Sequence, residues 1–263
     1  MKISIVTASY NQGEFIEEAI KSVLDQNYPK FEHIIMDNCS TDNTVAILKR
    51  YPHLKWFSLP DKGQSDALNK GFKMAEGDII GWLNADDFYE EGCFTTISED
   101  FLSKPKADII YGDYRIINKS GRVISLRKEL DFDPFMLKYL HFLYIPTTTS
   151  FFKRRIFEEG NFLDISYNYA MDYDFFMRLV NKKYIFSHTP NILASFRVHS
   201  GAKSKTATKK QLYEQKCVLF KQDIFLSAVP FVFRNPMRLF LIFVARLKRI
   251  YLKIFTGCYN IYL

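Results

Sequence analysis

Apolar runs and amphipathic segments alternate through the first 90 residues, and this alternation constrains the fold more than any other feature. Four apolar runs, each the length of a buried strand, lie at residues 3–8, 31–36, 56–59 and 79–83. Between them, apolar side chains recur at helical spacing at residues 15–24, 45–51 and 64–75. Strands that alternate with helices in this way predict a parallel sheet with right-handed crossovers.

Three of the expected strands end in polar loops, at residues 7–12, 37–43 and 84–87. Ligands of open α/β sheets bind beyond the carboxyl ends of the strands, so we expect these loops to converge on one site. The third loop reads Asn84-Ala85-Asp86-Asp87, and clustered carboxylates suit a divalent cation such as Mg²⁺ or Mn²⁺. The alternative is an ordinary turn, because Asn and Asp are common turn residues.

The chain contains neither a GxGxxG sequence nor a GxxxxGK sequence followed by Ser or Thr. The sequence therefore does not favour a dinucleotide-binding protein of the Rossmann type or a P-loop nucleotide-binding protein. A nucleotide in the expected crevice would need a metal ion to hold its phosphates.

The second half of the chain is less regular. Short strands are expected at residues 108–111, 114–118, 123–126, 147–152, 184–187 and 192–197. A short helix is expected at residues 154–159, and a longer one at residues 172–180 with Asp172 in its first turn. The aromatic-rich residues 131–149 are expected to shape an acceptor site.

Four motifs follow one another along the chain: residues 7–11 (TASYN), 37–42 (DNCSTD), 84–87 (NADD) and 171–178 (MDYDFFMR). In this order they resemble the family 2 glycosyltransferases, which have the GT-A fold and use nucleotide-activated sugars. The resemblance runs from about residue 3 to about residue 204. It implies a GT-A (Rossmann-like) α/β fold, in which helices flank a mostly parallel central sheet.

The resemblance also implies how the chain divides. Residues 1–204 would be the catalytic domain, with a nucleotide-sugar-binding half at 1–90 and an acceptor-binding half at 91–204. Residues 205–263 would be a basic, amphipathic helical tail.

The resemblance implies a pocket for the nucleotide-sugar donor. The residues expected to border the base, the ribose and the sugar are Thr7, Tyr10, Asn11, Asp37, Asn38, Asp66, Asn69, Lys70, Asn84 and Ala85. From the residues alone, Tyr10 could instead serve packing, and Asp66 could be a carboxylate that favours the start of a helix.

The resemblance further implies that Asp86 binds the metal, as the last carboxylate of a DXD motif, and that His199 approaches the metal or the diphosphate. Asp172 would be the catalytic base. The residues alone leave two alternatives open: Asp172 as a carboxylate favoured at a helix N-terminus, and His199 as a structural histidine.

Four residues in three of the motifs depart from the family pattern. Asn84 replaces the first aspartate of the DXD motif, which weakens the expected metal site. Met171 replaces the usual Glu before the base, and Asn38-Cys39 replace the usual glycines.

The chemistry can also be argued from the reaction itself. A divalent cation stabilises a leaving diphosphate, and a positioned carboxylate removes the proton of an acceptor hydroxyl. One base and one metal suffice for a single displacement, which inverts the anomeric centre, whereas a retaining enzyme usually needs a second, nucleophilic carboxylate. Two rivals remain: a nucleotidyltransferase, and a non-catalytic glycosyltransferase-like partner in a biosynthetic complex.

The net charge of +7 favours anionic partners, and four widely spaced cysteines without a CxxC pair suit a reducing cytosol.

Residues 224–263 contain six basic and no acidic residues. Arg238, Arg246, Arg249 and Lys253 share one arc of a helix whose remainder is apolar, a pattern typical of an interfacial helix. The alternative is a helix packed on the catalytic domain with a solvated basic stripe. A nucleic-acid reading module is missing from the sequence.

No signal peptide and no membrane-spanning window are expected. Together these features predict a bacterial, cytoplasmic enzyme, peripheral on the inner face of an anionic cell membrane. It would transfer a sugar to a glycan or lipid-linked acceptor in the synthesis of a surface polysaccharide.

Overall fold

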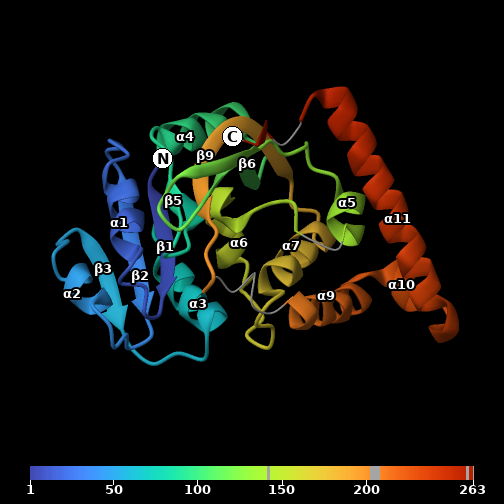
Figure 1. Cartoon of the computed structure of the whole chain (residues 1–263), viewed down its shortest axis with the longest axis horizontal. Coiled ribbons are helices and arrows are strands. Elements are labelled where there is room, and N and C mark those ends of the chain that lie inside the picture. Colours follow the sequence, from blue (N-terminus) through green and yellow to red (C-terminus); the bar gives the residue numbers. More distant parts are fainter. Residues whose placement is uncertain (141–142, 202–207, 259–260, 263) are drawn as a thin grey trace.

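A computed structural model describes residues 1–140, 143–201, 208–258 and 261–262 of the chain (Figure 1). Its strands are β1 Ile3–Ser9, β2 Phe31–Asp37, β3 Leu54–Ser58, β4 Ile79–Trp82, β5 Phe88–Tyr89, β6 Ile109–Ile117, β7 Val123–Arg127, β8 Ser150–Lys153, β9 Phe186–Arg197 and β10 Ile261–Tyr262. Its helices are α1 Ile16–Leu24, α2 Thr44–Leu48, α3 Gln64–Met74, α4 Cys93–Ser103, α5 Pro134–Tyr139, the 3₁₀ turn η1 Thr147–Thr149, α6 Arg155–Glu158, α7 Met171–Asn181, α9 Thr208–Gln222, α10 Ile224–Ala228 and α11 Phe231–Thr256.

The N-terminal half of the sheet is parallel, as predicted, with the order β3-β2-β1-β4. Its inner strands are buried on both faces, which explains why they read as continuous apolar runs. Helix α3 crosses β1 and β2, and Gly71 permits the approach: a Cβ there would lie 2.3 Å from Val6 Cγ1. The polar loops that follow β1, β2 and β4 therefore meet at one edge.

The second half of the sheet is mixed. Strand β8 is antiparallel to both β4 and β6, and the long strand β9 is parallel to β6 and antiparallel to β5. The strands predicted at 108–111 and 114–118 form one strand, β6, and those at 184–187 and 192–197 form β9. The β6–β9 pairing shifts register at Gly112, where a Cβ would lie 2.6 Å from Leu193. Because of this irregularity, the sequence predicted two short strands where the structure has one continuous strand. The predicted α/β fold class is confirmed.

The C-terminal helices lie against the catalytic part of the chain. Helix α9 packs on α7, and α11 runs alongside α5 at the edge of the molecule (Figure 1). Two of the four cations on the basic arc of α11 contact the catalytic part of the chain. Arg249 Nη2 lies 3.1 Å from a carboxylate oxygen of Glu129, and Lys253 donates to the Lys128 carbonyl at 3.0 Å. Glu129 is buried, and desolvation raises the pKa of its carboxyl, so cations from α11 are drawn inward to it.

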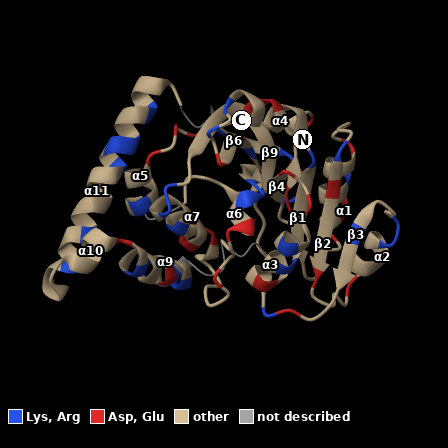
Figure 2. Ribbon diagram, turned by 180° about the vertical axis from the view of Figure 1, so that it is seen from behind, with Lys and Arg blue, Asp and Glu red and all other residues tan. Residues whose placement is uncertain are grey.

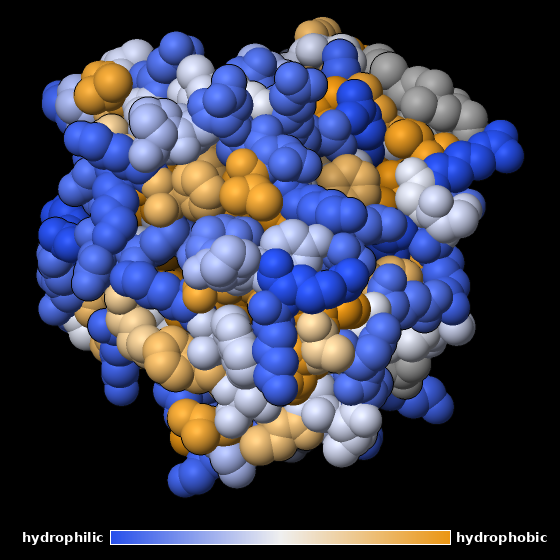
Figure 3. All heavy atoms as spheres, turned by 90° about the vertical axis from the view of Figure 1, so that its left-hand side faces the viewer, coloured by the Kyte–Doolittle hydropathy of each residue, from blue (hydrophilic) through white to orange (hydrophobic). Residues whose placement is uncertain are grey.

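Ile242 and Ala245 of α11 are buried, but much of the apolar surface of this helix faces outward. Apart from its bands of Lys and Arg, the helix carries uncharged residues (Figure 2). The exposed large apolar side chains on it are Phe231, Val232, Phe233, Leu239, Phe240, Phe243, Leu247, Ile250, Tyr251, Ile254 and Phe255. The face at the opposite end of the molecule is instead mostly hydrophilic, with apolar atoms in separate patches (Figure 3). No helix of the described residues combines the length and the apolarity that crossing a bilayer requires.

Candidate active site

The pairing of β5 with β9 brings the NADD loop and the segment after β9 together. Phe88 pairs with Ser195 in antiparallel register, so residues before β5 meet residues after β9. Asp86 Oδ2 lies 3.1 Å from His199 Nε2. The His199 ring also packs on Phe15, with 4.8 Å between the ring centroids. A carboxylate and an imidazole that are 113 residues apart in the sequence thus form one polar pair.

Arg197 holds this loop in place. Its side chain is buried, with its guanidinium over the rings of Phe15 and Phe88. Its backbone N–H donates to Asp87 Oδ1 at 2.8 Å, and its Nε donates to the Asp86 carbonyl at 2.9 Å. Arg197 therefore fixes the backbone that presents the Asp86 side chain. The sequence indicated no role for Arg197, because its partners are distant in the chain.

Asp87 is buried behind Asp86. Its Oδ2 accepts hydrogen bonds from Thr148 Oγ1 at 2.7 Å and from Asn84 Nδ2 at 2.9 Å. Burial, together with the charge of Asp86, raises the pKa of Asp87 to about 7. Asp87 is therefore an internal anchor of the loop, and Asp86 is the carboxylate that reaches the surface of the site.

A cavity of about 610 Å³ opens in front of this loop, within the size range of ligand pockets. It unites several residues that the sequence predicted for the site: Tyr10, Asn38, Asn84, Ala85, Asp86, Asp172 and His199. Asp172 reaches it from the first turn of α7, where its Oδ1 accepts the Tyr173 N–H at 2.7 Å. The Asp86–His199 pair and the expected base therefore line one cavity.

Other predicted donor-binding residues are engaged with protein groups. Thr7 is buried, and its hydroxyl lies 3.0 Å from His33 Nε2. Asn11 Oδ1 accepts the Thr41 N–H at 2.9 Å, which ties the loop after β1 to the loop after β2. Asp37 is buried and accepts a hydrogen bond from Ser58 Oγ at 2.6 Å.

The three predicted residues on α3 are also engaged. Asn69 exchanges two hydrogen bonds with the backbone of Leu163, at 2.8 and 2.9 Å. Asp66 and Lys70 pair with each other at 2.9 Å, and this contact lowers the pKa of Asp66. Contact of these three residues, and of Thr7, Asn11 and Asp37, with a donor stays a prediction.

Comparison with known proteins identifies the family. The family model described as glycosyl transferase family 2 matches residues 4–161. The chain belongs to glycosyl transferase family 2. A poly-beta-1,6-N-acetyl-D-glucosamine synthase of Staphylococcus epidermidis is 34% identical to this transferase over 123 residues, which cover 45% of the chain and 30% of that protein. An uncharacterized glycosyltransferase of Rickettsia typhi is 27% identical over 262 residues, covering 89% of the chain and 80% of the relative.

A putative teichuronic acid biosynthesis glycosyltransferase of Bacillus subtilis, TuaG, is 37% identical over 95 residues, which cover 34% of the chain and 37% of TuaG. The matched part thus spans about a third of the length of the poly-N-acetylglucosamine synthase and of TuaG.

Solved structures with the same fold include S. aureus TarS 1-349 in complex with UDP-GlcNAc, with a TM-score of 0.67 and 19% identity. That match covers 85% of this transferase and 68% of the TarS chain. The mannosyltransferase PcManGT from Pyrobaculum calidifontis, in complex with GDP-Man and Mn²⁺, has a TM-score of 0.65 and 17% identity over 93% and 73% of the two chains. Both likenesses establish the GT-A fold of this glycosyltransferase.

The donor atoms of this transferase fit a cation that is shared with a substrate. Asp86 and His199 offer one carboxylate and one imidazole. Within residues 1–140, 143–201, 208–258 and 261–262, no three His, Cys, Asp or Glu side chains surround one position. A structural zinc site, which needs four protein ligands, does not fit this set. A Mg²⁺ or Mn²⁺ ion that keeps positions for phosphate and water does fit.

The departures from the family pattern have local explanations. Cys39 adopts a φ of 50°, a left-handed conformation that suits the glycine usual at this position. Asn38 Oδ1 accepts the Asp61 N–H at 3.0 Å, so its amide orders the loop that leads to α3. Met171 is buried, and its sulfur lies 2.8 Å from Ser65 Oγ, so the position before Asp172 packs against α3.

Sequence reasoning missed several residues that line the cavity. They include Asp61, Gly63 and Gln64 before and at the start of α3, Trp82 on β4, Tyr114 on β6, Asn168 and Tyr169 before α7, Phe196 on β9 and Gln211 on α9. Gly63 has a φ of 105° and comes directly before a helix, which was a usable local signal. The residues on β6 and α9 gave no such signal, because only tertiary packing brings them to the site.

Proposed function

We propose that this transferase is an inverting enzyme that moves a sugar from a nucleoside-diphosphate sugar to a hydroxyl group of a glycan or lipid-linked acceptor. The observation that carries the proposal is the single cavity lined by Asp86, His199 and Asp172. Asp86 and His199 suit the diphosphate end of a donor, and Asp172 would be the carboxylate that accepts a proton. Tyr10 is exposed beside them, in a position suited to stacking on a base.

In the proposed reaction, the Asp172 carboxylate accepts the proton of the acceptor hydroxyl while that oxygen attacks the anomeric carbon. The new C–O bond forms as the bond to the diphosphate oxygen breaks, and the nucleoside diphosphate leaves as an anion. A divalent cation, Mn²⁺ or Mg²⁺, held by Asp86 and His199 would stabilise the negative charge on that leaving group. Arg197 keeps the Asp86 backbone fixed throughout.

The relatives support the substrate class. TarS was solved with UDP-GlcNAc, and PcManGT with GDP-Man and Mn²⁺. The poly-N-acetylglucosamine synthase and the teichuronic acid enzyme make bacterial cell-surface polymers. We extend these roles to the chain as a proposal: donor sugar transfer in the synthesis of a bacterial surface polysaccharide.

A donor panel tests this proposal. Thermal shifts with nucleoside diphosphates and Mn²⁺ select the base, because stabilisation grows as RT ln(1 + [L]/Kd). The matching nucleotide sugars are then incubated with the enzyme, and the released products are quantified. Release of nucleoside diphosphate supports glycosyl transfer. A parallel incubation with nucleoside triphosphates and sugar 1-phosphates tests the alternative, because a nucleotidyltransferase joins these two substrates and releases pyrophosphate. Absence of turnover with every substrate favours a non-catalytic partner.

We also propose that α11 contacts the inner face of an anionic cell membrane, which makes the enzyme a peripheral cytoplasmic protein. An interfacial helix buries its apolar side at the boundary of headgroups and acyl chains. The outward apolar side of α11 matches this requirement, and Arg246 is an exposed cation on the same helix. Because Arg249 and Lys253 contact the catalytic part of the chain, burial of apolar surface, rather than charge, would supply most of the binding energy.

The proposed division of labour follows the same lines. Residues 1–90 would hold the donor, residues 91–204 the acceptor, and residues 205–263 the membrane contact. Gln211 of α9 lines the cavity, so the beginning of the tail takes part in the site.

A further inference from the structure

Helix α7 begins without a side-chain N-cap. The residue at the N-cap is Ala170, whose side chain cannot accept a hydrogen bond, and alanine is among the poorest N-cap residues. The backbone N–H groups of Asn168, Tyr169 and Ala170 nevertheless all have an acceptor. Three successive N–H groups that converge on one point form a concave site for an anion.

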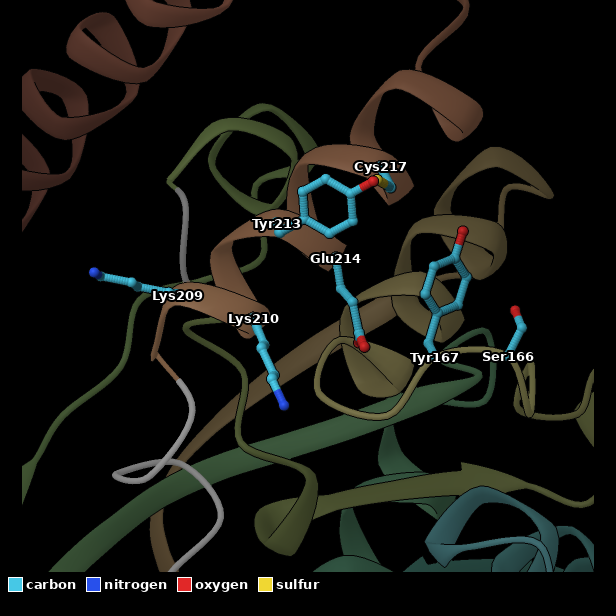
Figure 4. A pocket seen from close by; sticks show the side chains of 7 residues that line it. All are labelled: Ser166, Tyr167, Lys209, Lys210, Tyr213, Glu214 and Cys217. Carbon is cyan, nitrogen blue, oxygen red and sulfur yellow. The ribbon is translucent and has the colours of Figure 1, made fainter.

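The anion in this site is the carboxylate of Glu214, from helix α9. Its Oε2 accepts the N–H groups of Asn168, Tyr169 and Ala170 at 3.1, 2.7 and 2.9 Å. The Glu214 side chain leaves α9 and points toward the loop that carries Ser166 and Tyr167 (Figure 4). Its negative charge also lies at the positive end of the α7 dipole.

A second contact fixes α9 against α7. Gln222 Nε2 donates to Asp174 Oδ1 at 3.1 Å, and Asn181 Nδ2 donates to the Gln222 carbonyl at 2.8 Å. Helix α9 therefore holds the segment before α7, its first turn and its last residue. Glu214 binds the backbone that leads into Asp172, since Ala170 precedes Asp172 by two residues.

The segment that Glu214 binds is itself part of the active-site wall. Asn168, Tyr169, Met171 and Asp172 all line the 610 Å³ cavity. A displacement of residues 168–170 would move the backbone from which the Asp172 carboxylate projects. Because a misplacement of about 1 Å at a reacting group can cost about 10²-fold in rate, the position of this segment matters for catalysis.

We propose that Glu214 is a positioning residue for the reaction: its carboxylate binds the backbone of residues 168–170 and so sets the place of Asp172 in the cavity. This inference rests on the proposed role of Asp172 as the base. It assigns part of the catalytic arrangement to the C-terminal helical region.

The test uses two substitutions in the full-length protein. Glu214→Gln keeps the size of the side chain and removes its charge, and Glu214→Ala vacates the anion site. We expect kcat at saturating donor to fall about 10- to 100-fold in both variants, with unchanged affinity for the nucleoside diphosphate and Mn²⁺. Glu99→Gln, an exposed glutamate on α4, is the matched control and should behave as the wild type.

Added small carboxylates distinguish a positioning role of Glu214 from a purely structural one, because only a positioning role predicts that they restore kcat. Added formate can occupy the anion site of Glu214→Ala and should raise its kcat. It should not raise that of Glu214→Gln, whose amide still fills the space. Folded Glu214 variants that turn over at the wild-type rate would overturn the inference. So would a loss of kcat with a parallel loss of donor affinity and no response to formate.

Comparison with Asp172→Asn separates the two proposals. If Asp172→Asn loses transfer while both Glu214 variants keep it, the base assignment stands and the positioning role fails. If Asp172→Asn keeps transfer, the base assignment itself fails, and the Glu214 inference fails with it.

Discussion

Replacement of Asp172 by Asn should abolish transfer without unfolding the protein. Asp172 Oδ1 accepts the Tyr173 N–H at 2.7 Å, and an asparagine oxygen can accept the same hydrogen bond. The lost negative charge at the start of α7 costs about 0.3–1 kcal/mol of helix stability. The variant should therefore remain folded, with a small decrease in melting temperature.

The effect on the reaction should be larger. General-base catalysis contributes about 10²–10⁴-fold in rate, which corresponds to about 3–5 kcal/mol in the activation barrier. We expect kcat at saturating donor to fall by that factor. In the proposed site, donor affinity depends on Asp86, His199 and the residues around the base and not on Asp172, so calorimetric titration with the nucleoside diphosphate and Mn²⁺ should give an unchanged Kd.

Asp174→Asn on the same helix is the matched control. Asp174 is fully buried and bonded to Arg178 Nε at 2.7 Å, so its replacement should lower stability by about 1.5–3 kcal/mol while the folded enzyme keeps its turnover. The opposite pattern, in which Asp172→Asn loses stability and keeps near-wild-type turnover, would remove Asp172 from the mechanism.

Three further outcomes are expected. Asp86→Ala should abolish metal-dependent nucleotide binding, and unchanged calorimetric affinity would show that the metal lies elsewhere. Phe240→Ser with Phe243→Ser should weaken vesicle binding about 10²-fold or more, since each buried Phe contributes about 1.5–3 kcal/mol; cosedimentation equal to wild type would contradict a membrane role for α11. Arg249→Met should destabilise the protein at pH 7 by at most about 3 kcal/mol, because the buried Glu129 carboxyl can take up a proton once the cation is removed. The loss of stability should shrink toward pH 4.5, and a pH-independent loss would refute this account.

The parallel half of the fold was predictable because its signals are local. Strands β1, β2 and β4 are short apolar runs, and each is followed by turn-forming polar residues. Topology then places the ends of parallel strands at one edge, which is why Tyr10, Asn38 and Asp86 meet in one cavity. His199 joins them through the pairing of β9, whose two predicted pieces gave its position but not its continuity.

The remaining site residues could not be assigned from spacing alone. A helical pattern shows that Asp66, Asn69 and Lys70 share one region of α3, but it does not show which protein groups compete for them. In the structure, Asn69 donates to the Leu163 backbone, and Asp66 and Lys70 form an i,i+4 ion pair with each other.

The direction of α11 shows the same limit. The sequence predicts an arc of cations and an apolar remainder, but the pattern does not say which side faces the catalytic domain. The buried carboxylate of Glu129 determines which side of α11 faces the catalytic domain. Glu129 lies on the catalytic domain where desolvation disfavours its charge, and Arg249 offsets that cost. Arg249 and Lys253 face inward for this reason, whereas Arg246 and much of the apolar surface of α11 are exposed.

The replacement of the first DXD aspartate by Asn84 changes the charge of the loop more than its shape. Asn84 Nδ2 donates to both Asp87 Oδ2 and Thr148 Oγ1, at 2.9 and 3.1 Å. A carboxylate at this position could not donate, and it would add a third negative charge beside Asp86 and the buried Asp87, whose pKa already lies near 7. The amide avoids that repulsion, so a cation at the proposed site would be attracted mainly by the charge of Asp86, with His199 as its neighbour.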